Sequence, residues 1–207
     1  MWQRRVRWDR SSVSSANESP PGHGLPSGIH VSSSPLGLSL IAEQADLGNL
    51  STGGTLGLGR VKEATLQSEP GFMPAFRATV LYGEDYVTGD PNEPITRPDL
   101  TGTVYPDDGS TPFQMHSGGI QVADAELAAI VATNTSEGRK IPYGAVYSVW
   151  TPTFRGGDKA YSNLQKSIFV GSETVSDSGT PGEFLVGIRI SKVSPVKTNI
   201  TIGEEFP

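Results

Sequence analysis

The sequence predicts a mainly β protein, a β-sandwich or small β-barrel with one short helix at about residues 122–133 and an extended N-terminal arm. Three observations support this fold class. Apolar and polar residues alternate in several segments after residue 60, which is the pattern of half-buried strands. Gly/Pro-rich turn signals separate those segments. The first part of the chain has a different composition, rich in Ser, Gly and Pro.

The first 59 residues are predicted to form the arm. Its tip, residues 1–10, contains four arginines and one aspartate and therefore carries a net charge of +3. Residues 11–40 contain Glu18 as their only formal charge, and such a neutral, Ser/Gly/Pro-rich stretch buries too little apolar area to offset its ordering entropy. The glycine-rich segment 53–59 is predicted to be a hinge, and residues 60–207 the β body.

The body is predicted to consist of short strands joined by turns. The predicted strands are 60–66, 74–82, 102–105, 144–150, 167–170, 183–193 and 198–202. The clearest alternation, in 183–193, places every second residue from Phe184 to Ile190 on one apolar face. In 74–82 the same period places Tyr82 on the face of Ala78 and Val80.

One helix is predicted within the body. Residues 122–133 are rich in alanine, and Leu127, Ile130 and Val131 have the i, i+3, i+4 spacing of a single helical face. Asp124 is a suitable N-cap because its carboxylate can accept a hydrogen bond from a free amide of the first turn.

Charge and hydropathy exclude several function classes. The net charge is −6, so the chain beyond the basic tip carries −9 and is a poor match for the clustered Lys/Arg that nucleic-acid surfaces need. The basic start is not followed by the apolar segment of a signal peptide. The chain also lacks the long apolar run of a membrane helix. We therefore expect synthesis in the cytoplasm and no membrane contact.

Catalytic motifs are sparse. A Ser-His-Asp arrangement would have to use His116 with Ser117 or Ser110 and with Asp107 or Asp108, but the G-x-S-x-G motif of nucleophile elbows is missing. We expect His116 to be an exposed or interfacial loop residue. Cysteine is absent, which excludes thiolate metal sites and cysteine nucleophiles. The sequence therefore predicts no enzyme activity and no cofactor.

An acidic stretch, 84–99, is the best candidate for a ligand site. Its acidic and asparagine side chains are Glu84, Asp85, Asp90, Asn92, Glu93 and Asp99. Calcium is bound by such oxygen-rich loops, with Asp90, Asn92 and Glu93 as candidate ligands, although the spacing is not that of an EF-hand. A surface loop solvated by its carboxylates is the ordinary explanation, and paired carboxylates for glycoside hydrolysis are a further alternative.

The arm also carries candidate partner contacts. These residues are Trp2, Arg4, Arg5, Val6, Arg7, Trp8, Ile29, Val31, Leu36, Leu38 and Leu40. Arginine and tryptophan at the tip could stack on single-stranded nucleic acid. They could equally insert as anchors in a protein pocket, where both residue types are favoured, and we expect the protein partner.

The segments 141–146 (IPYGAV) and 184–188 (FLVGI), together with the arm and the Gly/Pro-rich body, resemble small β-barrel head-decoration proteins of tailed phages. The resemblance implies a virion structural protein that stabilises a capsid, binds capsid or tail subunits through its arm, and forms homo-oligomers, often trimers. A receptor- or carbohydrate-binding β-sandwich is the alternative function, and a hydrolase a third.

Overall fold

The computed structural model describes residues 29–31, 36–122, 125–131 and 138–195, all within one compact unit, residues 28–197. The longer strands are β2 (Leu36–Asn49), β3 (Thr55–Ser68), β4 (Arg77–Gly89), β5 (Ile95–Pro106), β6 (Phe113–Val122), β8 (Ser148–Gly156), β9 (Ile168–Asp177) and β10 (Glu183–Pro195). The shorter elements are β1 (Ile29–Val31), β7 (Lys140–Ile141), α1 (Ala125–Val131), the 3-10 turn η1 (Lys159–Tyr161) and α2 (Ser162–Gln165).

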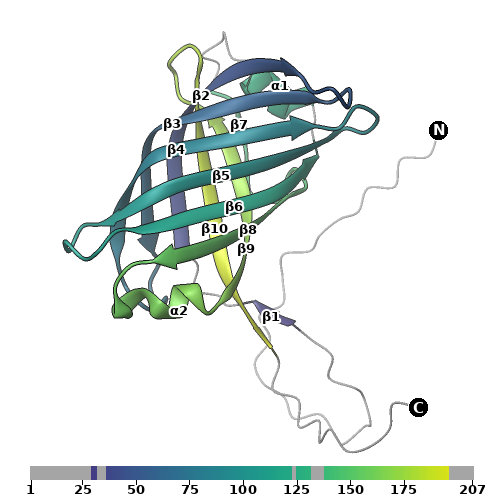
Figure 1. Cartoon of the computed structure of the whole chain (residues 1–207). Coiled ribbons are helices and arrows are strands. Elements are labelled where there is room, and N and C mark those ends of the chain that lie inside the picture. Colours follow the sequence, from purple (N-terminus) through teal and green to yellow (C-terminus); the bar gives the residue numbers. More distant parts are fainter. Residues whose placement is uncertain (1–28, 32–35, 123–124, 132–137, 196–207) are drawn as a thin grey trace, which may run out of the picture. The chain divides into compact units, whose positions relative to one another are not determined.

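The longer strands form a closed barrel. Within the described ranges, eight antiparallel strands follow one another in the order β2-β3-β4-β5-β6-β8-β9-β10, and β10 also pairs with β2 (Figure 1). The short strands β1 and β7 add to β10 and β9. The mainly β prediction is confirmed. Of the two predicted architectures, sandwich and barrel, the closed ring of strand pairings shows the barrel. None of the described helices is long and apolar enough to cross a membrane.

Alternation along the strands builds the core. Strand β10 buries Phe184, Val186, Ile188 and Ile190, as its pattern predicts. The predicted helix is also confirmed as α1, which buries Leu127 and Ile130. Asp124, its predicted cap, lies outside the described residues. Helices α1 and α2 lie near opposite ends of the barrel (Figure 1).

Aromatic rings fill the end of the barrel near η1 and α2. The ring of Phe113 lies at its centre, with ring centroids 5.1 Å from Tyr161, 6.1 Å from Phe76 and 6.1 Å from Phe154. Phe154 in turn makes an edge contact with Phe169 at 5.4 Å. Edge and tilted contacts of this kind stabilise aromatic clusters beyond their buried area. This end is therefore a packed core.

A β-bulge in β4 changes which residues face inward. Leu81 pairs with Thr103 and Glu84 with Thr101, so β4 has one residue more than β5 between these pairs. The bulge includes Tyr82, whose φ is 56° and whose side chain is 79% exposed. The prediction that Tyr82 shares the buried face of Val80 is therefore wrong.

The barrel begins earlier than the predicted boundary between arm and body. Leu36, Leu38 and Leu40 are only 0%, 3% and 6% exposed, so these predicted partner contacts are core residues of β2. The predicted hinge 53–59 is also wrong, because it comprises a tight turn at Gly53 and the start of β3. The average composition of residues 11–40 does not indicate the start of this strand, because its apolar residues alternate with glycine and serine.

The remaining predicted partner contacts are not all described. Ile29 and Val31 belong to β1, where their backbones pair with Pro195 and Val193 of β10. The other predicted contacts and one predicted strand lie outside the described residues: Trp2, Arg4, Arg5, Val6, Arg7, Trp8 and the strand 198–202.

Candidate functional site

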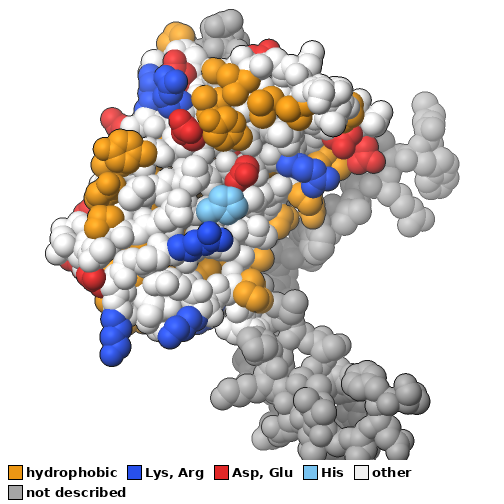
Figure 2. Space-filling model, in the orientation of Figure 1, with side chains coloured by type: hydrophobic (Ala, Val, Ile, Leu, Met, Phe, Trp, Pro, Cys, Tyr) orange, Lys and Arg blue, Asp and Glu red, His pale blue; other side chains and the backbone are white. Residues whose placement is uncertain are grey.

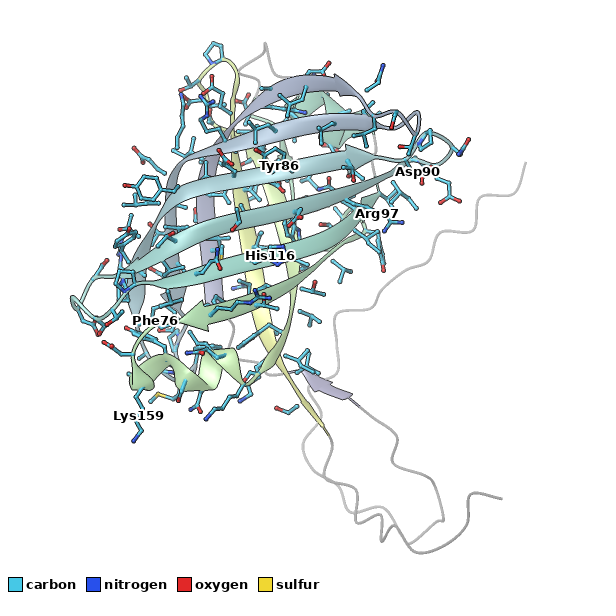
Figure 3. The ribbon with its side chains drawn as sticks, viewed as in Figure 1. Phe76, Tyr86, Asp90, Arg97, His116 and Lys159 are labelled. Atoms are coloured by element: carbon cyan, nitrogen blue, oxygen red, sulfur yellow. The ribbon has the colours of Figure 1, made fainter. Side chains whose placement is uncertain are left out.

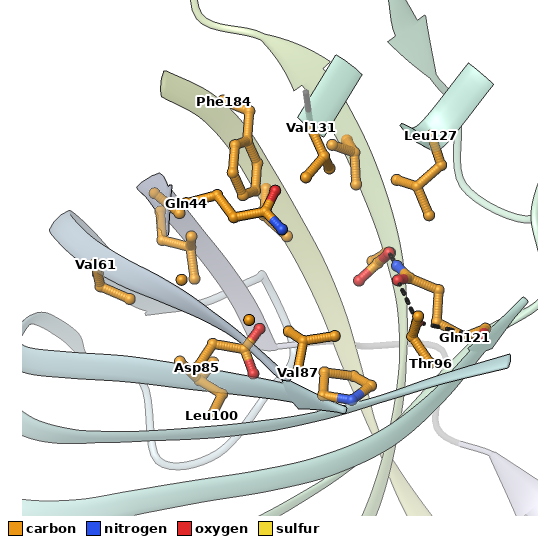
Figure 4. Close-up of a pocket in the computed structure, with 18 of the residues that line it drawn as sticks. Gln44, Val61, Asp85, Val87, Thr96, Leu100, Gln121, Leu127, Val131 and Phe184 are labelled. Carbon is orange, nitrogen blue, oxygen red and sulfur yellow. Dashed lines mark hydrogen bonds between the residues drawn. The ribbon is translucent and has the colours of Figure 1, made fainter. Parts of the chain in front are cut away.

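The barrel interior contains a cavity of about 220 Å³ at the end near α1. Its wall is mainly aliphatic, with contributions such as Leu40, Leu100 and Val186 from the strands. Figure 4 shows the side chains of Asp85 and Gln121 pointing into this space, and α1 adds Leu127, Ala128 and Val131 to its lining. The interior is therefore packed with aromatic rings at one end and hollow at the other.

Two glycines of β3 leave room for the cavity. Gly57 and Gly59 line it and pair with Val87 and Asp85 of β4. A Cβ atom at Gly59 would lie 3.4 Å from the Asp85 Cβ and 4.0 Å from its Oδ2. Larger side chains on this face would therefore occupy the space in front of the Asp85 carboxyl group.

Glu173 of β9 is a buried carboxyl group held by several donors. The Trp150 Nε1 donates to its Oε2 at 2.7 Å, and the Gln121 Nε2 donates to its Oε1. Burial raises the pKa of Glu173, while the hydrogen bonds from Trp150, Gln121 and Ser148 act in the opposite direction. Thr96 donates to the Gln121 Oε1 at 3.1 Å and orients that amide (Figure 4). Glu173 is therefore fixed in position.

Asp85 of β4 is the less constrained carboxyl group. Its Oδ1 accepts a hydrogen bond of 2.9 Å from the Asp99 amide, and no donor to its Oδ2 occurs among the described residues. Burial raises the pKa of Asp85 to about 7; the Asp99 amide lowers it, and the charges of Glu173 and Asp99 raise it. Asp85 can therefore gain or lose a proton near neutral pH while facing the cavity.

His116 lies on the outer face of β6, not in the loop that the sequence predicts. Its Nε2 is 2.6 Å from the Asp99 Oδ1, and both side chains are largely exposed. Tyr86 and Arg97 line the same shallow hollow (Figure 3), on a face where acidic, basic and apolar side chains are interspersed (Figure 2). Ser117 is buried on the opposite face, because neighbouring residues of a strand alternate.

The Ser-His-Asp combinations considered from the sequence are not assembled. The carboxylate beside His116 belongs to Asp99, and neither Asp107 nor Asp108 contacts the imidazole in the described structure. Asp108 instead accepts a hydrogen bond of 2.9 Å from the amide of Ser110.

The acidic stretch 84–99 is divided between two strands and a turn. The Asp90 Oδ1 accepts hydrogen bonds from the amides of Asn92 at 2.8 Å and Glu93 at 3.2 Å, which closes the β4–β5 turn. The described part of the chain contains no group of three or more acidic, histidine or cysteine side chains placed to hold a metal ion. Of the six acidic and asparagine side chains named in this stretch, only Asp85 lines the cavity.

Three residues of the site were not identified from the sequence: Glu173, Gln121 and Trp150. The predicted strand 167–170 continues in the structure to Asp177, and its inward residues include Phe169, Glu173 and Val175. A glutamate at an inward position of an alternating strand is a signal that could have identified the site, because an unpaired carboxylate is costly to bury.

Comparisons with known proteins identify solved structures with a similar fold. No functionally curated protein matches the chain. A protein of unknown function from Clostridium acetobutylicum ATCC 824 is 17% identical, with a TM-score of 0.61 over 81% of this chain and 100% of that chain. A conserved protein of unknown function from Rhodopseudomonas palustris is also 17% identical, with a TM-score of 0.62 over 81% and 99%.

A β-barrel-like protein from Acinetobacter baumannii AYE is 16% identical, with a TM-score of 0.54 over 86% of this chain and 100% of that chain. At these identities the three likenesses show a shared fold. The model of one family, described as protein of unknown function (DUF3237), matches residues 38–193, which span the barrel from β2 to β10. The chain therefore belongs to the DUF3237 family.

Proposed function

We propose that this protein binds a small, mainly apolar organic molecule inside the barrel. The observation that carries the proposal is the cavity itself, an aliphatic space into which a few polar side chains converge. Ligand sites of small molecules have this composition, and eight-stranded barrels are just wide enough to hold one small ligand.

The cavity volume limits the size of the ligand. A dry, apolar cavity of about 150 Å³ in another protein accepts benzene. The cavity here measures about 220 Å³. It therefore suits a molecule of about ten non-hydrogen atoms on the same scale.

The proposal is tested by filling the cavity from the β3 side. Gly57→Val places a branched side chain in the cavity, where the first added carbon would lie 3.4 Å from the Gln44 Nε2, an ordinary contact. Gly37→Val is the matched control, because a Cβ there would meet only the Gln67 carbonyl oxygen, at 3.8 Å. Valine is favoured in strands, so both variants should fold.

The readout is the affinity for 1-octanol, a neutral molecule of suitable size, measured by titration calorimetry. We expect saturable binding to the wild type and to Gly37→Val, and at least a tenfold weaker affinity for Gly57→Val. Circular dichroism and thermal unfolding check that each variant is folded. The proposal fails if the wild type binds no octanol, or if Gly57→Val binds it as tightly as the wild type does.

The virion and carbohydrate-binding hypotheses stay predictions. The virion hypothesis depends on residues 2–8, which lie outside the described ranges. The carbohydrate hypothesis expects binding loops over 84–115, and much of this range forms strands β4, β5 and β6 with Tyr86 and Tyr105 partly exposed.

A further inference from the structure

The cavity lining is acidic, which bears on the kind of ligand it holds. Among the described residues, its ionisable side chains are Asp85 and Glu173, with no lysine, arginine or histidine. The other side chains with hydrogen-bonding groups are Gln44, Thr96, Gln121 and Trp150. A low-dielectric cavity lined by charges of one sign attracts the opposite charge and disfavours its own.

The two carboxyl groups differ in how many hydrogen bonds they already accept. Glu173 already accepts hydrogen bonds from Trp150 and Gln121. Asp85 accepts one hydrogen bond, from the Asp99 amide to Oδ1, and its Oδ2 faces the space left by Gly59. A ligand that donates a hydrogen bond, or brings a positive charge, would therefore be held best at Asp85.

We propose, resting on the proposed ligand-binding function, that the ligand carries a protonated amine on its apolar body and that Asp85 is the residue that binds it. The ammonium group donates to Oδ2 and supplies the positive charge that the lining lacks. The apolar body occupies the aliphatic wall formed by residues such as Leu40 and Leu100. A carboxylate ligand of the same length would instead meet two carboxyl groups.

Binding of an amine should also depend on pH. The groups that act on Asp85 are Glu173, which also lines the cavity, and Asp99 of β5, whose side chain pairs with His116 outside the barrel. With its pKa raised to about 7 by burial, Asp85 is mainly neutral at pH 6 and mainly ionised at pH 8. The affinity for an ammonium ion should therefore rise over this range.

The experiment compares three ligands of equal chain length. The affinities of n-octylamine, 1-octanol and octanoate for the full chain are measured by titration calorimetry at pH 7, for the wild type and for Asp85→Asn. We expect octylamine to bind at least tenfold more tightly than octanol, and octanoate more weakly than octanol. Asp85→Asn should lose the preference for the amine and keep its affinity for octanol, which also shows that the variant is folded.

Two controls separate the possible outcomes. The chain is acidic, so the Gly57→Val variant is used to measure amine binding outside the cavity. Glu63→Gln removes an exposed carboxylate from β3 and should leave all three affinities unchanged. If octanol binds but octylamine binds no more tightly, or if Asp85→Asn keeps the preference for the amine, the inference fails while the proposed function stands. If octanol itself does not bind, the proposed function fails.

Discussion

Replacing Asp85 with asparagine should remove a pH dependence of folding stability that arises from placing this carboxyl group inside the barrel. Burial raises the pKa of Asp85 from 3.8 to about 7 in the folded state. Since the folded value lies above the unfolded one, the protonated form is the form that favours folding. The stabilisation is greatest below pH 3.8 and is lost as the pH rises through 7.

The size of the effect follows from the two pKa values. Between pH 5 and pH 8 the unfolded chain carries an ionised Asp85, while the folded chain changes from protonated to ionised. Integrated over this range, proton linkage lowers the free energy of unfolding of the wild type by about 2 to 3 kcal/mol. Asparagine does not titrate, so the variant lacks this contribution. The buried Glu173 is present in both proteins, so its contribution cancels except for the part that depends on the charge of Asp85.

The assay is urea unfolding followed by far-ultraviolet circular dichroism at pH 5, 6, 7 and 8. The stability difference between the wild type and Asp85→Asn should shift by about 2 to 3 kcal/mol across the series, in favour of the wild type at pH 5. Glu63→Gln, which alters an exposed residue of β3, should run parallel to the wild type. If the curves of the wild type and Asp85→Asn are parallel as well, the carboxyl group is not desolvated and the reasoning about the cavity is wrong.

Two further substitutions test the barrel and its fixed carboxyl group. Leu38→Ala should lower the free energy of unfolding in urea by about 2–5 kcal/mol, because Leu38 is 3% exposed in β2. A negligible loss would mean that Leu38 is not a core residue of the barrel and belongs to the arm, as the sequence predicts. Trp150→Phe removes the donor to the Glu173 Oε2 and should cost about 1–3 kcal/mol at pH 7 in the same assay; an unchanged stability would mean that this hydrogen bond does not hold Glu173.

The parts of the fold that alternate regularly could be predicted from the sequence. Strand β10 shows the two-residue period from Phe184 to Ile190, and α1 shows the spacing of Leu127 and Ile130. The choice between sandwich and barrel could not be made, because closure depends on β10 pairing with both β2 and β9. Such pairings join residues far apart in sequence, and alternation within one strand carries no information about them.

The site was harder to predict than the fold. Asp85 belongs to the acidic stretch that the sequence indicates, but a solvated loop is the simplest explanation for so many carboxylates close together. Gly57 and Gly59 appear in sequence as part of a flexible hinge, and their role as small inward residues emerges only from their pairing with β4. Glu173 lies far from both in sequence, so only the closed barrel brings these residues to one cavity.

The bulge at Tyr82 determines which side chains of β4 face the cavity and which face the solvent. Beyond it, Asp85 and Val87 line the cavity while Tyr86 is on the outer surface. Before the bulge the inward residues of β4 are Ala78 and Val80, so the extra residue reverses which positions face the cavity. Because the strand period is two, an unbroken alternation from Val80 would have placed Glu84 and Tyr86 in the interior and Asp85 in solvent. One unpaired residue thus determines which side chains of the half-strand a ligand meets.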